Sequence, residues 1–161
     1  MKVVKVNSLR EFEVEGEISV GSFVLTDNII GVSTTIYHQE EELTKYLSKG
    51  DMDMLKSFLP DISEPKYITK CYALMDTKLE NPKNLPKIGS DVKVLDNDSI
   101  KKIHVKNGEL YIPYLPFLIK KDIDVSRRIV TKLIELFPEY RDVLEIILAE
   151  IEFRLIEEVD L

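Results

Sequence analysis

The sequence has no tryptophan and only one cysteine, two histidines and six glycines among its 161 residues. A lone cysteine, Cys71, excludes an intrachain disulfide framework and is typical of proteins in a reducing compartment. No uninterrupted apolar run approaches the roughly 20 residues that a membrane-spanning helix needs, and the residues after Met1 lack the apolar core of a signal peptide. We therefore expect a cytoplasmic protein with no membrane segment.

A surplus of basic side chains is also missing. The net charge is −7, with 44% hydrophobic and 32% charged residues, a composition typical of a folded globular chain. Residues 1–121 carry 18 acidic against 17 basic side chains, whereas residues 122–161 carry 11 against 5. Because binding to nucleic acid draws much of its affinity from phosphate neutralisation, this charge balance argues against nucleic acid as a direct ligand.

Residues 1–37 have the pattern of short strands joined by tight turns. Phe12 and Val14 alternate with glutamates, and residues 29–37 are rich in β-branched side chains. Three strands in fewer than forty residues are typical of a meander in a barrel or sandwich. A helical pattern then spans 39–60, and strand signals resume at 67–75.

Residues 78–90 are predicted to be a loop, and residues 91–95 a short strand. Asp98 is a candidate N-cap for one helical turn that follows. Asn107-Gly108 is the dipeptide preferred in type I′ hairpin turns, and it would connect a strand at His104-Val105 to one at 110–112.

The C-terminal part has helical periodicity. Asp124 and Ser126 are alternative N-caps for its first helix, and Pro138 suits the first turn of a second helix. The second helix has apolar residues at spacings of four, three and four, which are candidates for contacts with a partner: Leu144, Leu148, Ile151 and Leu155. Its apolar arc is wide enough to predict an oligomer or a partner helix, with packing of the helix on its own barrel as the alternative.

The pattern as a whole predicts an α+β fold. We expect a small closed or partly open β-barrel with a short helical insertion at 39–60, followed by a C-terminal helical hairpin. Two units are expected, a barrel at 1–120 and an acidic amphipathic helical tail at 121–161.

No segment has a pattern that specifies catalysis. Residues 16–21 have the glycine spacing of a phosphate-binding loop but lack the lysine that must follow it, which favours a turn between strands. His38 and His104 have no second ligand at metal-binding spacing, and Cys71 is interpreted as a core residue. Asp76 and Asp96 lie near strand ends without a motif that joins them. We expect no catalytic residues, no metal and no cofactor.

Local concentrations of basic residues leave one alternative open. A barrel that binds nucleic acid would use the following lysines: Lys101, Lys102, Lys106, Lys120 and Lys121. A solvated rim is the other interpretation of the same residues, and it is the one that the net charge favours.

Several segments carry a resemblance to a known family. They are residues 20–25 (VGSFVL), 30–36 (IGVSTTI), 68–74 (ITKCYAL), the proline-containing loop at 82–86 and the hairpin at 106–112. Residues 9–119 resemble the HAS-barrel found at the N-terminus of archaeal HerA-type DNA translocases. In that family the barrel leads into an ATPase with a phosphate-binding loop, whereas here it leads into about forty helical residues, so no nucleotide site is transferred.

The resemblance implies a role in assembly, since barrels of this family pack around a ring and present a surface to a partner nuclease. We therefore expect a non-catalytic β-barrel adaptor or assembly protein, associated with a HerA-type translocase or its nuclease in DNA end processing and repair. The expected partner is a protein or a second copy of the chain, bound through the C-terminal helices. The alternative is a nucleic-acid-binding barrel protein.

Overall fold

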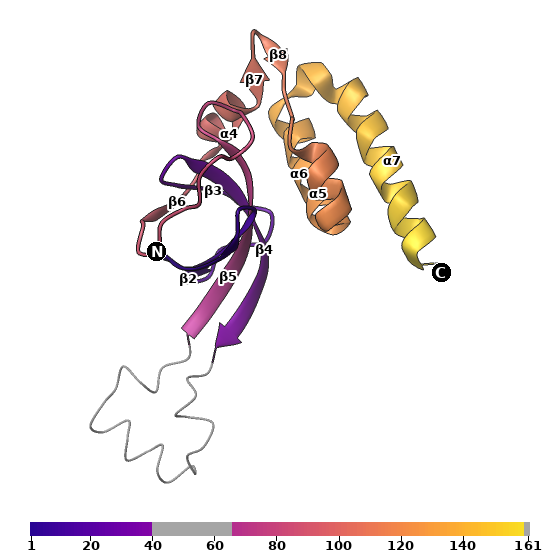
Figure 1. The fold of residues 1–161 in the computed structure, drawn as a ribbon. Helices are drawn as coiled ribbons and strands as arrows, with labels where there is room; N and C mark the ends of the chain where they lie inside the picture. Colours follow the sequence, from indigo (N-terminus) through magenta and orange to yellow (C-terminus); the bar gives the residue numbers. More distant parts are fainter. Residues whose placement is uncertain (40–65, 160–161) are drawn as a thin grey trace, which may run out of the picture.

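Six antiparallel strands form one strongly curled sheet in the order β1-β2-β5-β4-β3-β6 (Figure 1). Their bounds are β1 Lys2–Ser8, β2 Glu11–Glu15, β3 Phe23–Thr26, β4 Ile29–Gln39, β5 Lys66–Asp76 and β6 Val92–Val94. The structure is a computed structural model that describes residues 1–39 and 66–159. The helical insertion predicted at 39–60 lies outside these residues, apart from Gln39, which ends β4.

The curl follows from irregularities in the strand register. β1 has two register shifts against β2, and the β4–β5 ladder has two more, between Ile30 and Gly31 and between Ser33 and Thr35. Such bulges bend a strand and increase its twist. The sheet is therefore a half-barrel, and the predicted partly open barrel is confirmed.

The two edges of the half-barrel meet at the start of the chain. The backbone nitrogen of Val92 donates to the carbonyl of Met1 (2.9 Å), and that of Val3 donates to the carbonyl of Ser90 (3.0 Å). An ion pair between Lys2 and Asp91 (3.1 Å) lies beside them. These contacts join β1 to the segment that enters β6, although the two strands form no ladder with each other.

Successive side chains of a strand point to opposite faces of the sheet, and each face of this sheet carries a cluster of buried side chains. The inner face holds a cluster from both edges and the centre of the sheet: Val3, Phe12, Val14, Ile18, Val24, Ile29, Cys71, Ala73 and Val92. The prediction that Cys71 is a core residue is confirmed. Its burial raises the pKa of the thiol to about 12, so the thiol stays protonated at neutral pH.

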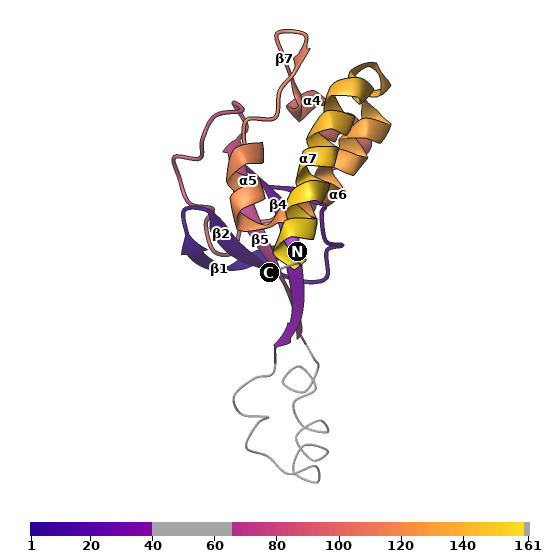
Figure 2. The same cartoon turned by 90° about the vertical axis from the view of Figure 1, so that its right-hand side faces the viewer.

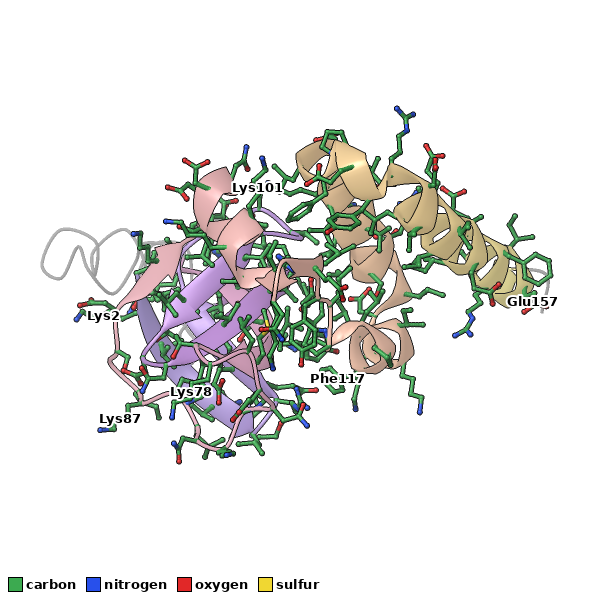
Figure 3. The ribbon with its side chains drawn as sticks, turned by 90° about the horizontal axis from the view of Figure 1, so that it is seen from above. Lys2, Lys78, Lys87, Lys101, Phe117 and Glu157 are labelled. Carbon is green, nitrogen blue, oxygen red and sulfur yellow. The ribbon has the colours of Figure 1, made fainter. Side chains whose placement is uncertain are left out.

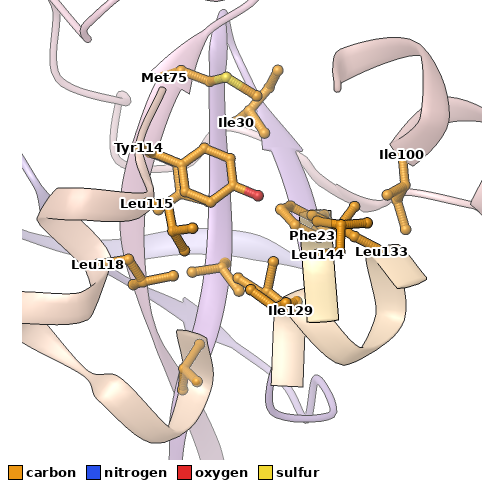
Figure 4. Packing of buried hydrophobic residues seen from close by; sticks show 14 of the residues in the cluster. Phe23, Ile30, Met75, Ile100, Tyr114, Leu115, Leu118, Ile129, Leu133 and Leu144 are labelled. Carbon is orange, nitrogen blue, oxygen red and sulfur yellow. The ribbon is translucent and has the colours of Figure 1, made fainter. Parts of the chain in front are cut away.

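Helices cover the outer face of the sheet. After β6 come α4 (Asn97–Ile103), the two-residue strands β7 (Val105–Lys106) and β8 (Glu109–Leu110), α5 (Leu115–Lys121), α6 (Ile123–Leu136), the 3-10 turn η1 (Pro138–Tyr140) and α7 (Arg141–Val159). Figure 4 shows Phe23 of β3 beside Leu133 of α6 and Leu144 of α7, all in one buried cluster. One core is thus shared by the sheet and the helices.

Arg10 fastens the turn between β1 and β2 to this layer. Its guanidinium donates to the carbonyls of Ala73 and Leu74, each at 3.2 Å, and lies 4.4 Å from the centre of the Phe117 ring on α5. The contact connects the sheet to α5.

The predicted helical hairpin is confirmed, with different caps. The N-cap of α6 is Asp122, whose carboxylate accepts from the backbone nitrogen of Val125 (3.0 Å), so the predictions of Asp124 and Ser126 are wrong. The helix begins earlier because Asp122 adopts an extended backbone directly after α5. Asp124 instead pairs with Arg127 and Arg128 on the surface. Pro138, predicted in the first turn of the second helix, begins the 3-10 turn η1, and α7 itself begins at Arg141.

Two local predictions around α4 also need correction. Its N-cap is Asp96, which accepts from the backbone nitrogen of Ser99 (2.8 Å), and Asp98 lies within the first turn. His104 belongs to the end of this helix and not to a strand. The Asn107-Gly108 turn is confirmed, with both residues at positive φ (55° and 76°), as a type I′ turn requires.

Candidate functional site

Helix α7 is the outermost element of the helical layer. It packs against α6 and lies on the side of α6 away from the sheet (Figures 1 and 2). Its side toward α6 buries Leu144 and Ile151 completely, and Leu148 and Leu155 lie partly buried on the same core. The spacing of four, three and four residues is therefore explained by packing within the chain.

This packing involves the four residues that the sequence suggests as partner contacts. Leu144 and Ile151 are buried inside the helical hairpin, whereas Leu148 and Leu155 are only partly buried, so a contact of these residues with a partner stays a prediction. The sequence shows the helical spacing of the apolar residues. It does not show which side of the helix packs against the rest of the chain. The inner face of α7 packs against α6 and shares one core with the sheet.

The outer face of α7 is also apolar, and it is exposed. Ile146 is 72% exposed, Ile156 60%, Phe153 58% and Val143 54%. A surface helix of a globular protein normally has charged or polar residues on its outer side. We call these four residues, together with Ala149 between them, the outer face of α7. They form the candidate functional site.

Acidic side chains run along this face. They are Asp142 near the start of α7, Glu150 in its middle and Glu157 near its end. Figure 3 labels Glu157 at the far end of the helix. The two basic residues of α7 bind neighbours on the same helix. Arg141 pairs with Glu145 (2.8 Å) and Arg154 with Glu150 (3.4 Å). The outer face therefore combines exposed apolar side chains with a net negative charge.

The lysines predicted to contact nucleic acid fall into two groups. Lys101 and Lys102 lie in the last turn of α4 next to β7, where the Lys106 amine lies 4.9 Å from the centre of the Tyr111 ring. Lys120 and Lys121 end α5. Figure 3 labels Lys101 and Phe117 of α5 at well-separated places on the molecule. The structure thus does not gather all five lysines, and the nucleic-acid alternative stays a prediction.

The carboxylates considered for catalysis bind the backbone. Asp76 accepts from the nitrogens of Lys78 (2.8 Å) and Glu80 (3.0 Å) and thereby shapes the loop after β5, while Asp96 caps α4. Asp76 also borders an open groove of about 1020 Å³ between this loop and the β3–β4 turn. Across residues 1–39 and 66–159 no group of three or more histidine, cysteine or acidic side chains could hold a metal ion.

His104 is completely buried where α4 meets the sheet. Its Nδ1 lies 2.7 Å from the carbonyl of Ile100, and its Nε2 lies 2.6 Å from the Tyr114 hydroxyl. Because a carbonyl only accepts, Nδ1 carries the hydrogen and Nε2 accepts from Tyr114. Burial lowers the pKa of His104 to about 4, although the bond to Ile100 acts in the opposite direction. His104 is thus a neutral side chain that joins the end of α4 to Tyr114 by hydrogen bonds.

Glu13 is an ionisable residue whose place the sequence does not reveal. Strand alternation predicts an exposed side chain, but Glu13 is only 3% exposed. The Tyr37 hydroxyl and the Asn7 amide (3.0 Å) donate to its carboxylate. Burial alone would raise the pKa of Glu13, but these hydrogen bonds together with the positive charges of Lys5 and Lys70 lower the pKa. Asn7 comes from the neighbouring strand β1 and Tyr37 from β4 on the far side of β5, and no local motif signals the cluster.

Comparison with known proteins does not assign the chain to a family. No family model matches the chain, and no curated protein matches it. Among the described helices, including α7 with its 19 residues, none is long and apolar enough to cross a membrane.

Proposed function

We propose that this protein is a non-catalytic β-barrel adaptor of the cytosol that binds another macromolecule through the outer face of α7. The observation that carries the proposal is the exposure of Ile146 (72%) and Phe153 (58%) in the middle of a regular helix. Burying a large apolar side chain is worth about 1.5–3 kcal/mol. A surface that keeps several such side chains in water is typical of an interaction site.

We further propose that the half-barrel is of the HAS-barrel type and that the partner belongs to a HerA-type translocase and nuclease assembly. Three segments of the resemblance support this idea, because residues 20–25, 30–36 and 68–74 contribute to β3, β4 and β5, which are neighbours in the sheet. The helices follow the half-barrel at the place where the translocases continue into their ATPase. In this proposal the helical hairpin connects the barrel to the assembly.

A binding experiment with matched variants tests the proposal. The immobilised chain is offered a purified archaeal HerA-type translocase and, separately, its nuclease. The double variant Ile146→Glu/Phe153→Glu should lose retention of the partner because it places two charges in the outer face. The control Leu85→Glu/Ile88→Glu makes the same chemical change at two other exposed apolar residues (50% and 70%) in the loop before β6, and it should bind like the wild type.

Circular dichroism establishes that both variants keep their helices and strands. Retention by the wild type and by the loop control, but not by the α7 variant, is the expected result. Equal retention by all three proteins would contradict the role of α7. No retention of either protein by the wild type would contradict the proposed partner.

A further inference from the structure

We propose that the outer face of α7 takes an amphipathic helix of another protein, with basic side chains along its apolar stripe, and not a second copy of this chain. The inference rests on the proposed function, in which this face is the interaction surface. It identifies the chemistry of the occupant from the positions of the apolar and acidic residues on α7.

The apolar part of the face has the form of a helix-packing stripe. Ile146 and Phe153 are seven residues apart, which is close to two helical turns and about 10 Å along the axis. Ala149 lies between them and is small enough to let another helix approach closely. Helices pack at about 8–10 Å between axes through such stripes. The shape of the surface therefore suits a helix as the occupant.

The charges on this stripe are acidic at regular intervals. Asp142 lies one turn before Ile146 and Glu157 one turn after Phe153, and Glu150 lies between Ile146 and Phe153. In the part of the chain that the structure describes, neither Asp142 nor Glu157 has a basic group within 4.0 Å, whereas Glu150 binds Arg154 of its own helix. The stripe thus offers acceptors at both ends to a basic partner.

A second copy fits this surface poorly in either direction. An antiparallel pairing that sets Ile146 against Phe153 of the second copy also sets Asp142 against Glu157 at both ends. A parallel pairing sets Asp142, Glu150 and Glu157 each against the same residue of the second copy. Like charges that face each other across helices are destabilising, so self-association is disfavoured by residues on the stripe itself.

A helix with lysine or arginine beside its apolar stripe is complementary to both the apolar and the acidic residues of the outer face of α7. Its apolar residues would contact Ile146 and Phe153, and its basic residues would lie opposite Asp142 and Glu157. Complementary charges of this kind add specificity and a faster association to the apolar contact. The same acidic residues disfavour anionic lipid and nucleic-acid phosphate at this face.

The test uses two synthetic helical peptides of 19 residues, the length of α7. Both carry the same leucine stripe, one flanked by lysines and the other by glutamates. Fluorescence anisotropy measures their binding to the full chain at low and high salt. At low salt we expect the lysine peptide to bind at least about tenfold more tightly than the glutamate peptide. High salt should reduce this difference between the two peptides.

Matched variants locate the binding on the protein. Ile146→Gln/Phe153→Gln should weaken binding of the lysine peptide about tenfold or more, whereas Leu85→Gln/Ile88→Gln should leave it unchanged. Asp142→Asn/Glu157→Gln should weaken it several-fold. The control Glu15→Gln/Glu109→Gln removes the same charge from exposed residues of β2 and β8, and it should have no effect. Equal losses in both charge variants would show attraction by net charge only and would overturn the proposal.

Light scattering over a wide concentration range tests the second copy directly. A monomer is expected throughout. A dimer that the substitution Ile146→Gln/Phe153→Gln converts to a monomer would contradict the proposal of a basic partner helix. It would still support the outer face of α7 as an interaction surface. Equal binding of both peptides, or binding of neither, would also overturn the inference, and the retention experiment with the translocase and nuclease then decides the proposed function separately.

Discussion

The curled sheet and the helical hairpin differ in how many of their apolar faces the chain covers. The sheet has a cluster inside its curl and a second one beneath the helices, so each of its faces carries a buried core. The hairpin is covered on one side only, because nothing in the described chain lies over the outer face of α7 (Figure 2). Stability of the fold therefore depends on the sheet and on the inner side of the hairpin, and the outer side of the hairpin is available for binding.

The largest expected effect separates the two sides of α7. Leu144→Ala should lower the free energy of unfolding by about 2–5 kcal/mol, because it leaves a cavity in the shared core. Ile146→Ala, two residues along the same helix, should change it by less than about 0.5 kcal/mol. Urea denaturation of both variants measures the difference. Similar values for the two would mean that the outer face is covered and would break the comparison.

The junction between sheet and helices should be sensitive to acid. The pKa of His104 is lowered from 6.5 to about 4 in the folded protein, so on acidification the unfolded chain takes up this proton first. Stability contributed by His104 is present above pH 6.5 and is lost as the pH falls toward 4, by up to about 3 kcal/mol.

Urea denaturation of the wild type and of His104→Gln across this pH range measures that loss. The difference in stability between the two proteins should narrow as the pH falls. A constant difference between the wild type and His104→Gln would contradict a neutral buried His104.

A single methyl group added on the inner face of the sheet should destabilise the protein. In Gly31→Ala the new Cβ would lie 2.8 Å from the carbonyl oxygen of Tyr72 and 2.9 Å from Cζ of Phe12. Crowding of this kind costs about 1–3 kcal/mol, to be measured by thermal or urea denaturation. Thr35→Ala, exposed on the same strand, serves as the control and should stay near the wild type. A Gly31→Ala variant as stable as the wild type would show that the half-barrel opens more easily than its packing indicates.

The smallest expected effect concerns the start of the hairpin. Asp122→Ala should destabilise the protein by about 1 kcal/mol because α6 loses its N-cap. Asp124→Ala should have a smaller effect, since its pairs with Arg127 and Arg128 are exposed. Denaturation curves of the two variants rank the carboxylates, and the opposite ranking would argue that Asp124 is the cap after all.

Local sequence patterns predicted much of the fold. The alternation around Phe12, the Asn107-Gly108 dipeptide and the apolar spacing of the last helix correspond to a strand, a type I′ turn and an amphipathic helix in the structure. These features depend on neighbours in the chain, which a pattern describes directly. The caps were less accessible, because Asp122, Asp124 and Ser126 lie within five residues and all are acceptable capping types.

The burial of Glu13 and the position of His104 could not be predicted in this way. Tyr37 reaches Glu13 from β4, a strand that is not even adjacent to β2 in the sheet, and Tyr114 reaches His104 across the β7–β8 hairpin. For the candidate site the sequence indicated a wide apolar arc on α7. It did not indicate which half of that arc the protein would cover.

Composition, periodicity and turn dipeptides determined that this chain combines a β-rich first part with an acidic helical second part, because those features act over a few neighbouring residues. Only the tertiary structure decided that α6 covers Leu144 and Ile151 and leaves Ile146 and Phe153 in water. That choice depends on how the hairpin is laid against the sheet, which is a matter of contacts between segments far apart in the sequence.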